Sequence, residues 1–170
     1  PFFLYFATND VHVPRYPNSR FWGKTDMGFR GDAIVQFDWS VGEIVKALES
    51  AGIRENTLII ITSDNGPVVD DGYADQAVEK LMNHEPWGPF RGGKYSTFEA
   101  GTRVPFIVNW QGKIASKKSE ALVSQIDLLA TLARLAGVDI SAKEVADSRD
   151  QLDAWLGHDE KGRDYIIGSA

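Results

Sequence analysis

The stretch Thr57–Pro67 constrains the fold of this chain more than any other. Its first six residues, 57–62, comprise five β-branched side chains and one leucine. A short apolar run of this kind is typical of a strand buried on both faces of a parallel sheet. The polar residues of 63–67 then end the strand. The pattern predicts an α/β fold with polar groups just beyond the carboxyl end of a central strand.

Asp64 and Asn65 stand where open α/β sheets bind their ligands. Asp64 offers a carboxylate and Asn65 a carbonyl oxygen, and such hard oxygen atoms suit Ca²⁺ or Mg²⁺. A second interpretation is a strand-end turn in which both side chains bond nearby backbone N–H groups. The two residues alone leave both interpretations open.

A similar arrangement occurs at the start of the sequence. The apolar run Phe2–Ala7 predicts a buried strand, and His12 lies among the polar residues that follow it. A histidine on such a loop can contact a ligand or act as an acid or base, or it can be a surface or capped side chain. Residues 31–51 predict a helix, because apolar residues recur at three- and four-residue spacing and Gly52 follows. Helix 31–51 and the strand after it fit a right-handed crossover unit.

Two further loops carry positive charge. Residues 15–30 form a basic, aromatic and irregular loop that could contact an anionic substrate or lie solvated. In residues 91–105, paired glycines allow close approach of the backbone to a ligand, and Arg91 and Lys94 supply positive charge. The glycine spacing excludes a Walker P-loop. An anion-binding loop of another kind and a glycine-rich β-turn are the alternatives.

The remaining pattern predicts a single domain over residues 1–170, since the sequence shows no repeats, no low-complexity tract and no clear linker. Apolar periodicity and short apolar runs predict the other elements. We expect strands at 105–110 and 165–167 and helices at 123–136 and 147–156. Within the first of these helices, Asp127 is interpreted as a structural residue.

Composition excludes several classes of protein. The formal net charge is −6, so nothing indicates a nucleic-acid partner. Cysteine is absent, which excludes disulfides, zinc–thiolate sites and cysteine nucleophiles within the sequence. No apolar run approaches the length of a membrane-spanning segment.

Taken together and in this order, the motifs resemble the sulfatase family of the alkaline-phosphatase-like superfamily. The Thr-Ser-Asp-Asn-Gly and Arg-Gly-Gly-Lys segments at this separation are a specific pairing. The resemblance implies an α/β fold: part of an alkaline-phosphatase/sulfatase-like mixed sheet flanked by helices. It covers nearly the whole chain and rests on residues 1–5, 12–14, 31–32, 38–42, 57–67, 91–94, 98–106, 110–114, 126–132 and 161–165.

The resemblance also implies roles for individual residues. Asp64 and Asn65 align with the pair that binds the catalytic divalent cation, usually Ca²⁺, with Mg²⁺ as the alternative. Lys94 aligns with the lysine that contacts the sulfate, and His12 with the histidine near the leaving-group oxygen, a candidate general acid. Arg91 is a further substrate-binding candidate. A sulfate ester needs its oxygens neutralised and its leaving oxygen protonated, which a cation, Lys94 and His12 together supply.

Some positions depart from the family pattern. Gln111 stands where a proline is usual, and Tyr95 and Ala100 stand where glycines are common. Sulfatases use a formylglycine made from the first residue of a Cys/Ser-x-Pro-x-Arg motif, which this sequence lacks. We therefore expect a fragment, the C-terminal part of a sulfatase catalytic region. Formylglycine is expected in a missing N-terminal part. We expect no turnover of a sulfate ester by these residues alone.

The full-length protein is expected to hydrolyse sulfate esters of a small molecule or, as for many relatives, of a carbohydrate. The alternatives are a phosphoesterase or phosphonate hydrolase of the same superfamily and a non-catalytic anion-binding module. We expect no nucleic-acid partner and no membrane segment. We also expect self-association through apolar surface that the missing half would cover. The family resemblance implies a periplasmic or secreted location.

Overall fold

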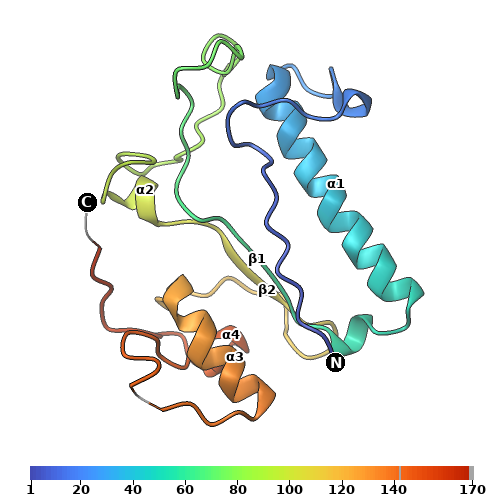
Figure 1. The fold of residues 1–170 in the computed structure, drawn as a ribbon. Coiled ribbons are helices and arrows are strands. Elements are labelled where there is room, and N and C mark those ends of the chain that lie inside the picture. Colours follow the sequence, from blue (N-terminus) through green and yellow to red (C-terminus); the bar gives the residue numbers. More distant parts are fainter. Residues whose placement is uncertain (142, 169–170) are drawn as a thin grey trace. The chain divides into compact units, whose positions relative to one another are not determined.

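The computed structural model describes residues 1–141 and 143–168 (Figure 1). They divide into two compact units. Residues 1–54 and 63–105 form unit 1, whereas residues 55–62 and the described residues between 106 and 168 form unit 2. The single domain over residues 1–170 stays a prediction.

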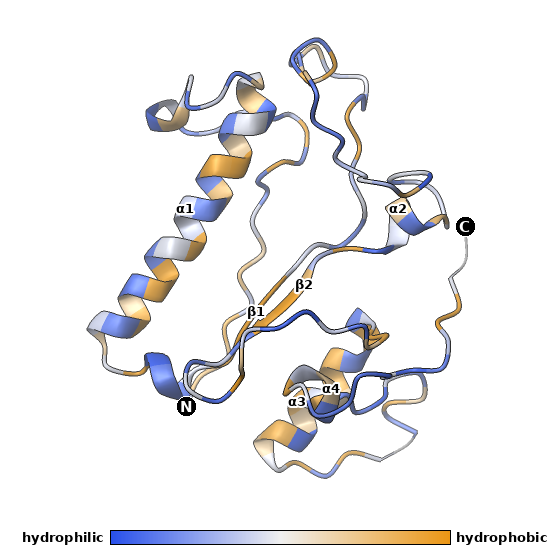
Figure 2. Cartoon of the chain, turned by 180° about the vertical axis from the view of Figure 1, so that it is seen from behind, coloured by the Kyte–Doolittle hydropathy of each residue, from blue (hydrophilic) through white to orange (hydrophobic). Residues whose placement is uncertain are grey.

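Unit 1 contains one long helix, α1 (Gly28–Ser50). The predicted end of this helix is confirmed, because Gly52 has a φ of +66° and its N–H donates to the Glu49 carbonyl oxygen (2.9 Å). Apolar and polar residues both occur along α1 (Figure 2), and η1 (Ser19–Phe21) packs against it. None of the described helices, α1 included, has the length and apolar character needed to cross a membrane.

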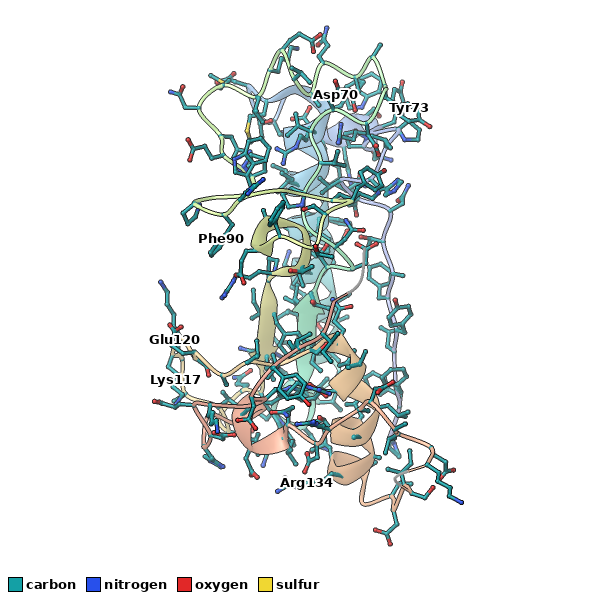
Figure 3. The ribbon with its side chains drawn as sticks, turned by 90° about the vertical axis from the view of Figure 1, so that its left-hand side faces the viewer. Asp70, Tyr73, Phe90, Lys117, Glu120 and Arg134 are labelled. Atoms are coloured by element: carbon teal, nitrogen blue, oxygen red, sulfur yellow. The ribbon has the colours of Figure 1, made fainter. Side chains whose placement is uncertain are left out.

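Most of the rest of unit 1 is loop, with one short helix, α2 (Glu99–Thr102). The described segment 63–98 contains turns and bends but no helix or strand. Side chains such as Asp70, Tyr73 and Phe90 extend from it (Figure 3). A long loop of this kind is a common carrier of functional residues.

The strand predicted at Phe2–Ala7 is absent, so that prediction is wrong for this structure. The segment is irregular, and its aromatic side chains are exposed, Phe3 by 76% and Tyr5 by 81%. A strand forms when a neighbour accepts and donates its backbone hydrogen bonds. The described part of unit 1 contains no strand to serve as that neighbour.

Unit 2 contains the one sheet in the described part of the chain. β1 (Ile59–Thr62) pairs with β2 (Phe106–Asn109), and Ile59 lies opposite Asn109. The sequence predicts both strands, but the parallel pairing expected for β1 is wrong, since the two strands run antiparallel. Each strand of a two-stranded ribbon keeps an open edge. β1 is also half-buried along its length, so the predicted burial on both faces is not seen in this structure.

Helical segments complete unit 2. η3 (Gln125–Asp127) runs directly into α3 (Leu128–Ala136), which packs against α4 (Leu152–Trp155). The helices predicted at 123–136 and 147–156 therefore form, the second over four residues only. The strand predicted at 165–167 is absent from the described structure, where a parallel bridge joins Leu122 to Gly162. A short turn, η2 (Arg54–Asn56), precedes β1.

A buried carboxylate holds the start of α3. Asp127 has no exposed surface and accepts hydrogen bonds from Ser124 N (3.0 Å), Arg149 N (2.9 Å) and Arg163 Nε (2.8 Å). Arg163 is itself buried, and the bond to Asp127 raises the pKa of its guanidinium. A fully satisfied buried carboxylate is a structural element, as predicted for Asp127.

Candidate functional site

Two of the residues predicted to act together, His12 and Lys94, meet in unit 1. They are 82 positions apart in the sequence, yet Lys94 Nζ lies 3.2 Å from His12 Nε2. The other ring nitrogen, Nδ1, lies 2.8 Å from the Val13 carbonyl oxygen. Because a carbonyl only accepts and an ammonium only donates, we assign the ring proton to Nδ1, with Nε2 accepting from Lys94. The pair combines a cation with a group that can bind or release a proton.

The local backbone presents His12 on a turn. The His12 N–H donates to the Asn9 carbonyl oxygen (3.1 Å), and Val11 has a φ of +72°, in the left-handed region. The imidazole is exposed. It lines a small recess of about 20 Å³ together with Asn9, Arg15 and Tyr16. The turn thus leaves the ring accessible from solvent on one side and in contact with Lys94 on another.

Asp64 and Asn65 open the loop that follows β1. Asp64 is exposed and Asn65 is half-buried. Asn65 Nδ2 donates to the Gly66 carbonyl oxygen (2.8 Å), which leaves its Oδ1 as the side-chain atom that could bind a cation. The Ser63 hydroxyl lies 3.5 Å from Asp64 Oδ1, a weak contact that does not occupy the carboxylate.

The loop of Asp64 and the loop of Lys94 are joined through their backbones. Gly66 N–H donates to the Gly101 carbonyl oxygen (2.9 Å), and Lys94 N–H donates to the Pro67 carbonyl oxygen (2.9 Å). A Cβ on Gly66 would lie 1.7 Å from the Ala100 carbonyl oxygen. Of the paired glycines, Gly93 also lies close to this segment, since a Cβ there would lie 2.8 Å from the Pro67 carbonyl oxygen. These contacts tie the two predicted motifs into one substructure.

Asp64 and Asn65 meet part of what a divalent cation requires. Within residues 1–141 and 143–168, no three His, Asp or Glu side chains gather closely enough to hold a metal ion. Asp64 and Asn65 supply two hard oxygens, whereas Ca²⁺ takes about six to eight. The pair fits such a cation in the chemistry of its donors and provides part of a coordination sphere.

Arg91 is held by its own loop. Its guanidinium carbon lies 4.0 Å from the centre of the Phe98 ring, and its carbonyl oxygen accepts from Ala100 N (3.0 Å). The side chain remains exposed while it stacks on the ring. Its substrate-binding role stays a prediction.

Sequence reasoning missed Arg15, which lies in the loop interpreted as substrate-contacting or solvated. The residue is only 3% exposed, and its guanidinium bonds Val11, Val68, Val69 and Asp75. An arginine in an irregular basic loop gives no sequence signal of burial, since all its partners except Val11 lie more than fifty positions away.

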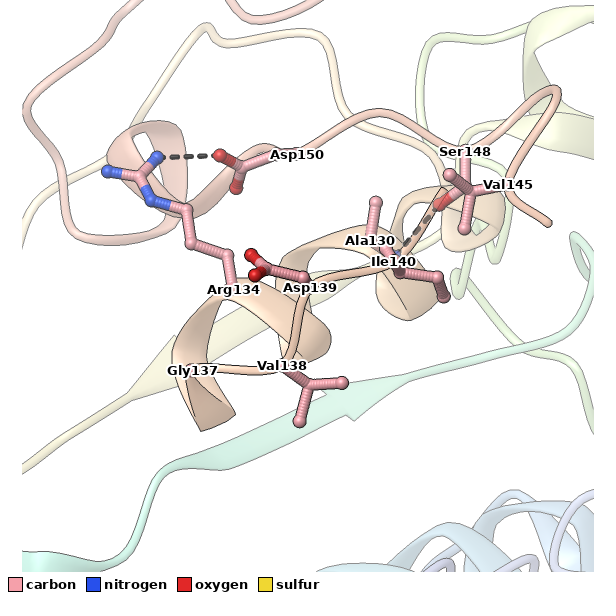
Figure 4. Close-up of a pocket in the computed structure, with 9 residues that line it drawn as sticks. All are labelled: Ala130, Arg134, Gly137, Val138, Asp139, Ile140, Val145, Ser148 and Asp150. Carbon is pink, nitrogen blue, oxygen red and sulfur yellow. Dashed lines mark hydrogen bonds and ion pairs between the residues drawn. The ribbon is translucent and has the colours of Figure 1, made fainter. Parts of the chain in front are cut away.

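A second hollow lies in unit 2 and contains none of the predicted site residues. Its volume is about 480 Å³. The ion pair between Arg134 and Asp150 (2.7 Å) lines it together with apolar side chains such as Val138 and Ile140 (Figure 4). Because Arg134 is already paired there, the hollow does not offer an uncompensated cation for a sulfate.

The comparisons with known proteins agree with the motifs. A family model described as Sulfatase matches residues 1–138. The N-acetylgalactosamine-6-O-sulfatase of Bacteroides thetaiotaomicron is 53% identical over 167 residues, which are 98% of this chain and 33% of that protein. The steryl-sulfatase of Rattus norvegicus is 36% identical over 159 residues, 93% of this chain and 27% of that protein. The chain thus spans about a third or less of the length of these curated relatives.

Solved structures show the same relationship. A structure from work on the metabolism of multiple glycosaminoglycans by Bacteroides thetaiotaomicron has a TM-score of 0.94 and 54% identity, over 98% of this chain and 35% of that one. The PsFucS1 sulfatase from Pseudoalteromonas sp. has a TM-score of 0.76 and 34% identity, over 92% of this chain and 30% of that one. These likenesses confirm the predicted fold class. With a family model matching most of its length, the chain belongs to the sulfatase family.

Proposed function

We propose that the natural protein carrying this sequence hydrolyses sulfate esters of a carbohydrate, with 6-O-sulfated N-acetylgalactosamine as the substrate class. Membership of the sulfatase family supports the reaction. The relative at 53% identity, named N-acetylgalactosamine-6-O-sulfatase, supports the substrate class. The observation that carries the proposal within this chain is the 3.2 Å contact between Lys94 and His12.

Lys94 is the proposed sulfate-binding residue. An ammonium has three N–H groups, and His12 accepts one of them. The others can donate to the sulfate oxygens, on which negative charge accumulates as the ester bond breaks. The backbone bond from Lys94 N–H to Pro67 O fixes the base of this side chain on the loop of Asp64.

His12 is the proposed general acid. Cleavage of an alkyl sulfate leaves an alkoxide oxygen, which departs far more readily when a neighbouring group protonates it. His12 Nε2 is the ring nitrogen that faces Lys94, so it would lie near a sulfate bound there. The Nδ1 contact with Val13 O fixes the ring orientation and leaves Nε2 as the nitrogen that exchanges protons. To act as the acid, Nε2 must first bind a proton, and it then donates to the leaving oxygen and no longer accepts from Lys94.

Asp64 and Asn65 are proposed to hold a divalent cation, Ca²⁺ or Mg²⁺, with their side-chain oxygens. When bound, the cation would neutralise charge on the sulfate oxygens. The formylglycine nucleophile of sulfatases has no counterpart among these residues, since the sequence lacks cysteine and the Ser-x-Pro-x-Arg motif. Arg91, exposed beside the Lys94 loop, is proposed to contact the substrate outside its sulfate.

The proposal is tested by sulfate release from 6-O-sulfated N-acetylgalactosamine by the natural protein. Lys94→Ala and His12→Ala should each lower kcat/KM by about 10²–10⁴-fold. Lys46→Ala is the matched control, because Lys46 is exposed on α1 and pairs with Glu43, and it should retain full activity. Activity of the two site variants equal to that of the control would refute the assigned roles.

The alternative functions give different outcomes in the same assay. A phosphoesterase or phosphonate hydrolase would release phosphate from the corresponding ester, or cleave a phosphonate, faster than it releases sulfate. A non-catalytic anion-binding module would bind the sulfated sugar in the presence of a chelator and turn over neither ester. Chelator-sensitive sulfate release is the outcome expected here.

A further inference from the structure

Arg15 is a buried cation of unit 1 with several hydrogen-bond partners, and the site described above does not use it. Its side chain is 1% exposed. Nε donates to Val11 O (3.1 Å), Nη2 to Val68 O (2.9 Å) and Nη1 to Val69 O (3.1 Å). A guanidinium buried in this way needs partners for its donors and its charge.

Asp75 supplies the opposite charge. Its Oδ2 lies 2.7 Å from Arg15 Nη1, and the Asp75 side chain is 11% exposed. The other oxygen, Oδ1, accepts from Ala77 N (3.0 Å), so the carboxylate is itself fixed by the backbone. Arg15 therefore has an ion-pair partner and backbone acceptors that do not depend on a substrate.

The partners of Arg15 belong to the two segments that carry the site. Val11 immediately precedes His12 and holds the left-handed conformation of that turn. Val68 directly follows Pro67, whose carbonyl oxygen accepts from Lys94 N. One guanidinium thus spans the turn of His12 and the segment hydrogen-bonded to Lys94.

We infer that Arg15 is a positioning residue that keeps His12 within hydrogen-bond distance of Lys94. We call the bonds from Arg15 to Val11, Val68 and Val69 the Arg15 clamp. The catalytic consequence of the clamp rests on the proposed function, but the clamp itself is a property of the fold. Arginine suits this place because its planar fork donates to several oxygens at fixed angles, whereas lysine is a single flexible point charge. Misplacing a reacting group by about 1 Å can cost on the order of 10²-fold in rate.

Rates on two substrates with different leaving groups, measured in the natural protein, distinguish a positioning role of Arg15 from a general loss of folded protein. Protonation by His12 matters for a sugar sulfate, whose alkoxide is a poor leaving group, and little for an aryl sulfate with an acidic phenol. We expect Arg15→Met to lower kcat for the sugar sulfate by about 10²-fold and for the aryl sulfate by less than about 10-fold. His12→Ala should show the same preference, and adding Arg15→Met to it should cost little more. Arg15→Lys should recover part of the loss.

Arg134→Met is the matched control. It also removes an arginine paired with aspartate, but in unit 2, and should leave both rates unchanged. Equal losses on the two substrates, or full additivity of Arg15→Met with His12→Ala, would overturn the inference. If Arg15→Met does not fold, Asp75→Asn removes only the counter-charge and should show the same leaving-group preference in weaker form.

Backbone hydrogen exchange tests the clamp without any reaction. Arg15→Met should accelerate exchange in residues 9–14 and 67–75 of the natural protein, and Arg134→Met should not. Unchanged exchange in those segments overturns the inference even when sulfate is released. Absence of sulfate release by the wild-type protein, combined with local acceleration, would refute the proposed function and uphold the clamp.

Discussion

At the scale of single residues, Tyr95 holds a backbone conformation that suits glycine better than tyrosine. Its φ is +73°, in the left-handed region where a Cβ crowds the following carbonyl oxygen. This gives a physical reason for the glycine that the resemblance to sulfatases leads us to expect at this position. The Tyr95 hydroxyl donates to Asp71 Oδ1 (2.9 Å), a contact that offsets part of the strain.

Replacing Tyr95 by glycine and by alanine separates the strain from the hydroxyl contact. Both variants lose the bond to Asp71, but only glycine also loses the Cβ. We expect Tyr95→Gly to have a free energy of unfolding about 1 kcal/mol higher than that of Tyr95→Ala. This reverses the order at unstrained positions, where alanine is favoured. Chemical denaturation of the two variants provides the measurement, and a more stable alanine variant would show that the position carries no strain.

At the scale of elements, glycines decide how closely the two loops of the site approach. The Gly66 N–H donates to the Gly101 carbonyl oxygen, and a Cβ on Gly66 would lie 1.7 Å from the Ala100 carbonyl oxygen of the other loop. Backbone atoms cannot move aside as the end of a flexible side chain can. The loop of Asp64 and the loop of Lys94 therefore keep their present spacing only while position 66 is glycine.

Gly66→Ala should destabilise the protein by roughly 3 kcal/mol or more, because overpacking against backbone forces the loops apart. It should also impair anion binding, since Lys94 is bonded to the same loop. The matched control is Gly42→Ala within α1, where a Cβ meets nothing within 4 Å. That control should stabilise the helix by about 1 kcal/mol. Thermal denaturation of both variants measures the difference, and similar shifts in Tm would contradict the argument.

The junction of η3 and α3 allows a second prediction at this scale. Asp127→Asn keeps the shape of the side chain but removes the charge that Arg163 faces, so it should destabilise unit 2 by roughly 3 kcal/mol. Glu160→Gln is the control, because its ion pair with Lys117 is on the surface and Glu160 is 79% exposed. It should change stability by less than about 1 kcal/mol. Denaturant unfolding measures the stability of both variants. Comparable losses would mean that burial of the Asp127–Arg163 pair does not increase its contribution to stability.

Helices were more predictable from this sequence than strands, for a physical reason. The hydrogen bonds of a helix lie within its own segment, so the periodicity of α1 and the glycine after it were enough to place it. A strand depends on its neighbour, and residues 2–7 have the composition of a strand without a described partner. The composition of β1 predicted its existence, but its direction relative to β2 depends on pairing that no local pattern encodes.

At the scale of the whole molecule, part of the candidate site followed from the sequence. The resemblance to sulfatases selected His12 and Lys94, and the structure brings them together across 82 positions. The burial of Arg15 could not be predicted from the sequence, because it depends largely on backbone carbonyl oxygens, which any residue type can provide. Burial of a charged group of this kind is a property of the fold and not of local composition.

Unit 1 also contains a histidine, His84, that should make the stability of the protein depend on pH. His84 Nδ1 lies 3.0 Å from Nη1 of Arg30, and because arginine only donates, this nitrogen must be unprotonated. Burial, followed by repulsion from the Arg30 guanidinium, lowers the pKa of His84 below its usual value. The folded protein therefore binds a proton at His84 less readily than the unfolded chain does.

This difference predicts a loss of stability in acid. The contribution of neutral His84 is fully present above the unfolded pKa of about 6.5 and is lost as pH falls through the lower folded pKa. We expect Tm to drop between pH 7.5 and pH 5 by less in His84→Gln than in the wild type, because glutamine accepts from Arg30 and does not titrate. His158→Gln, at an exposed histidine of unit 2, should follow the wild type. If His84→Gln follows it as well, the proton that destabilises the protein in acid binds elsewhere.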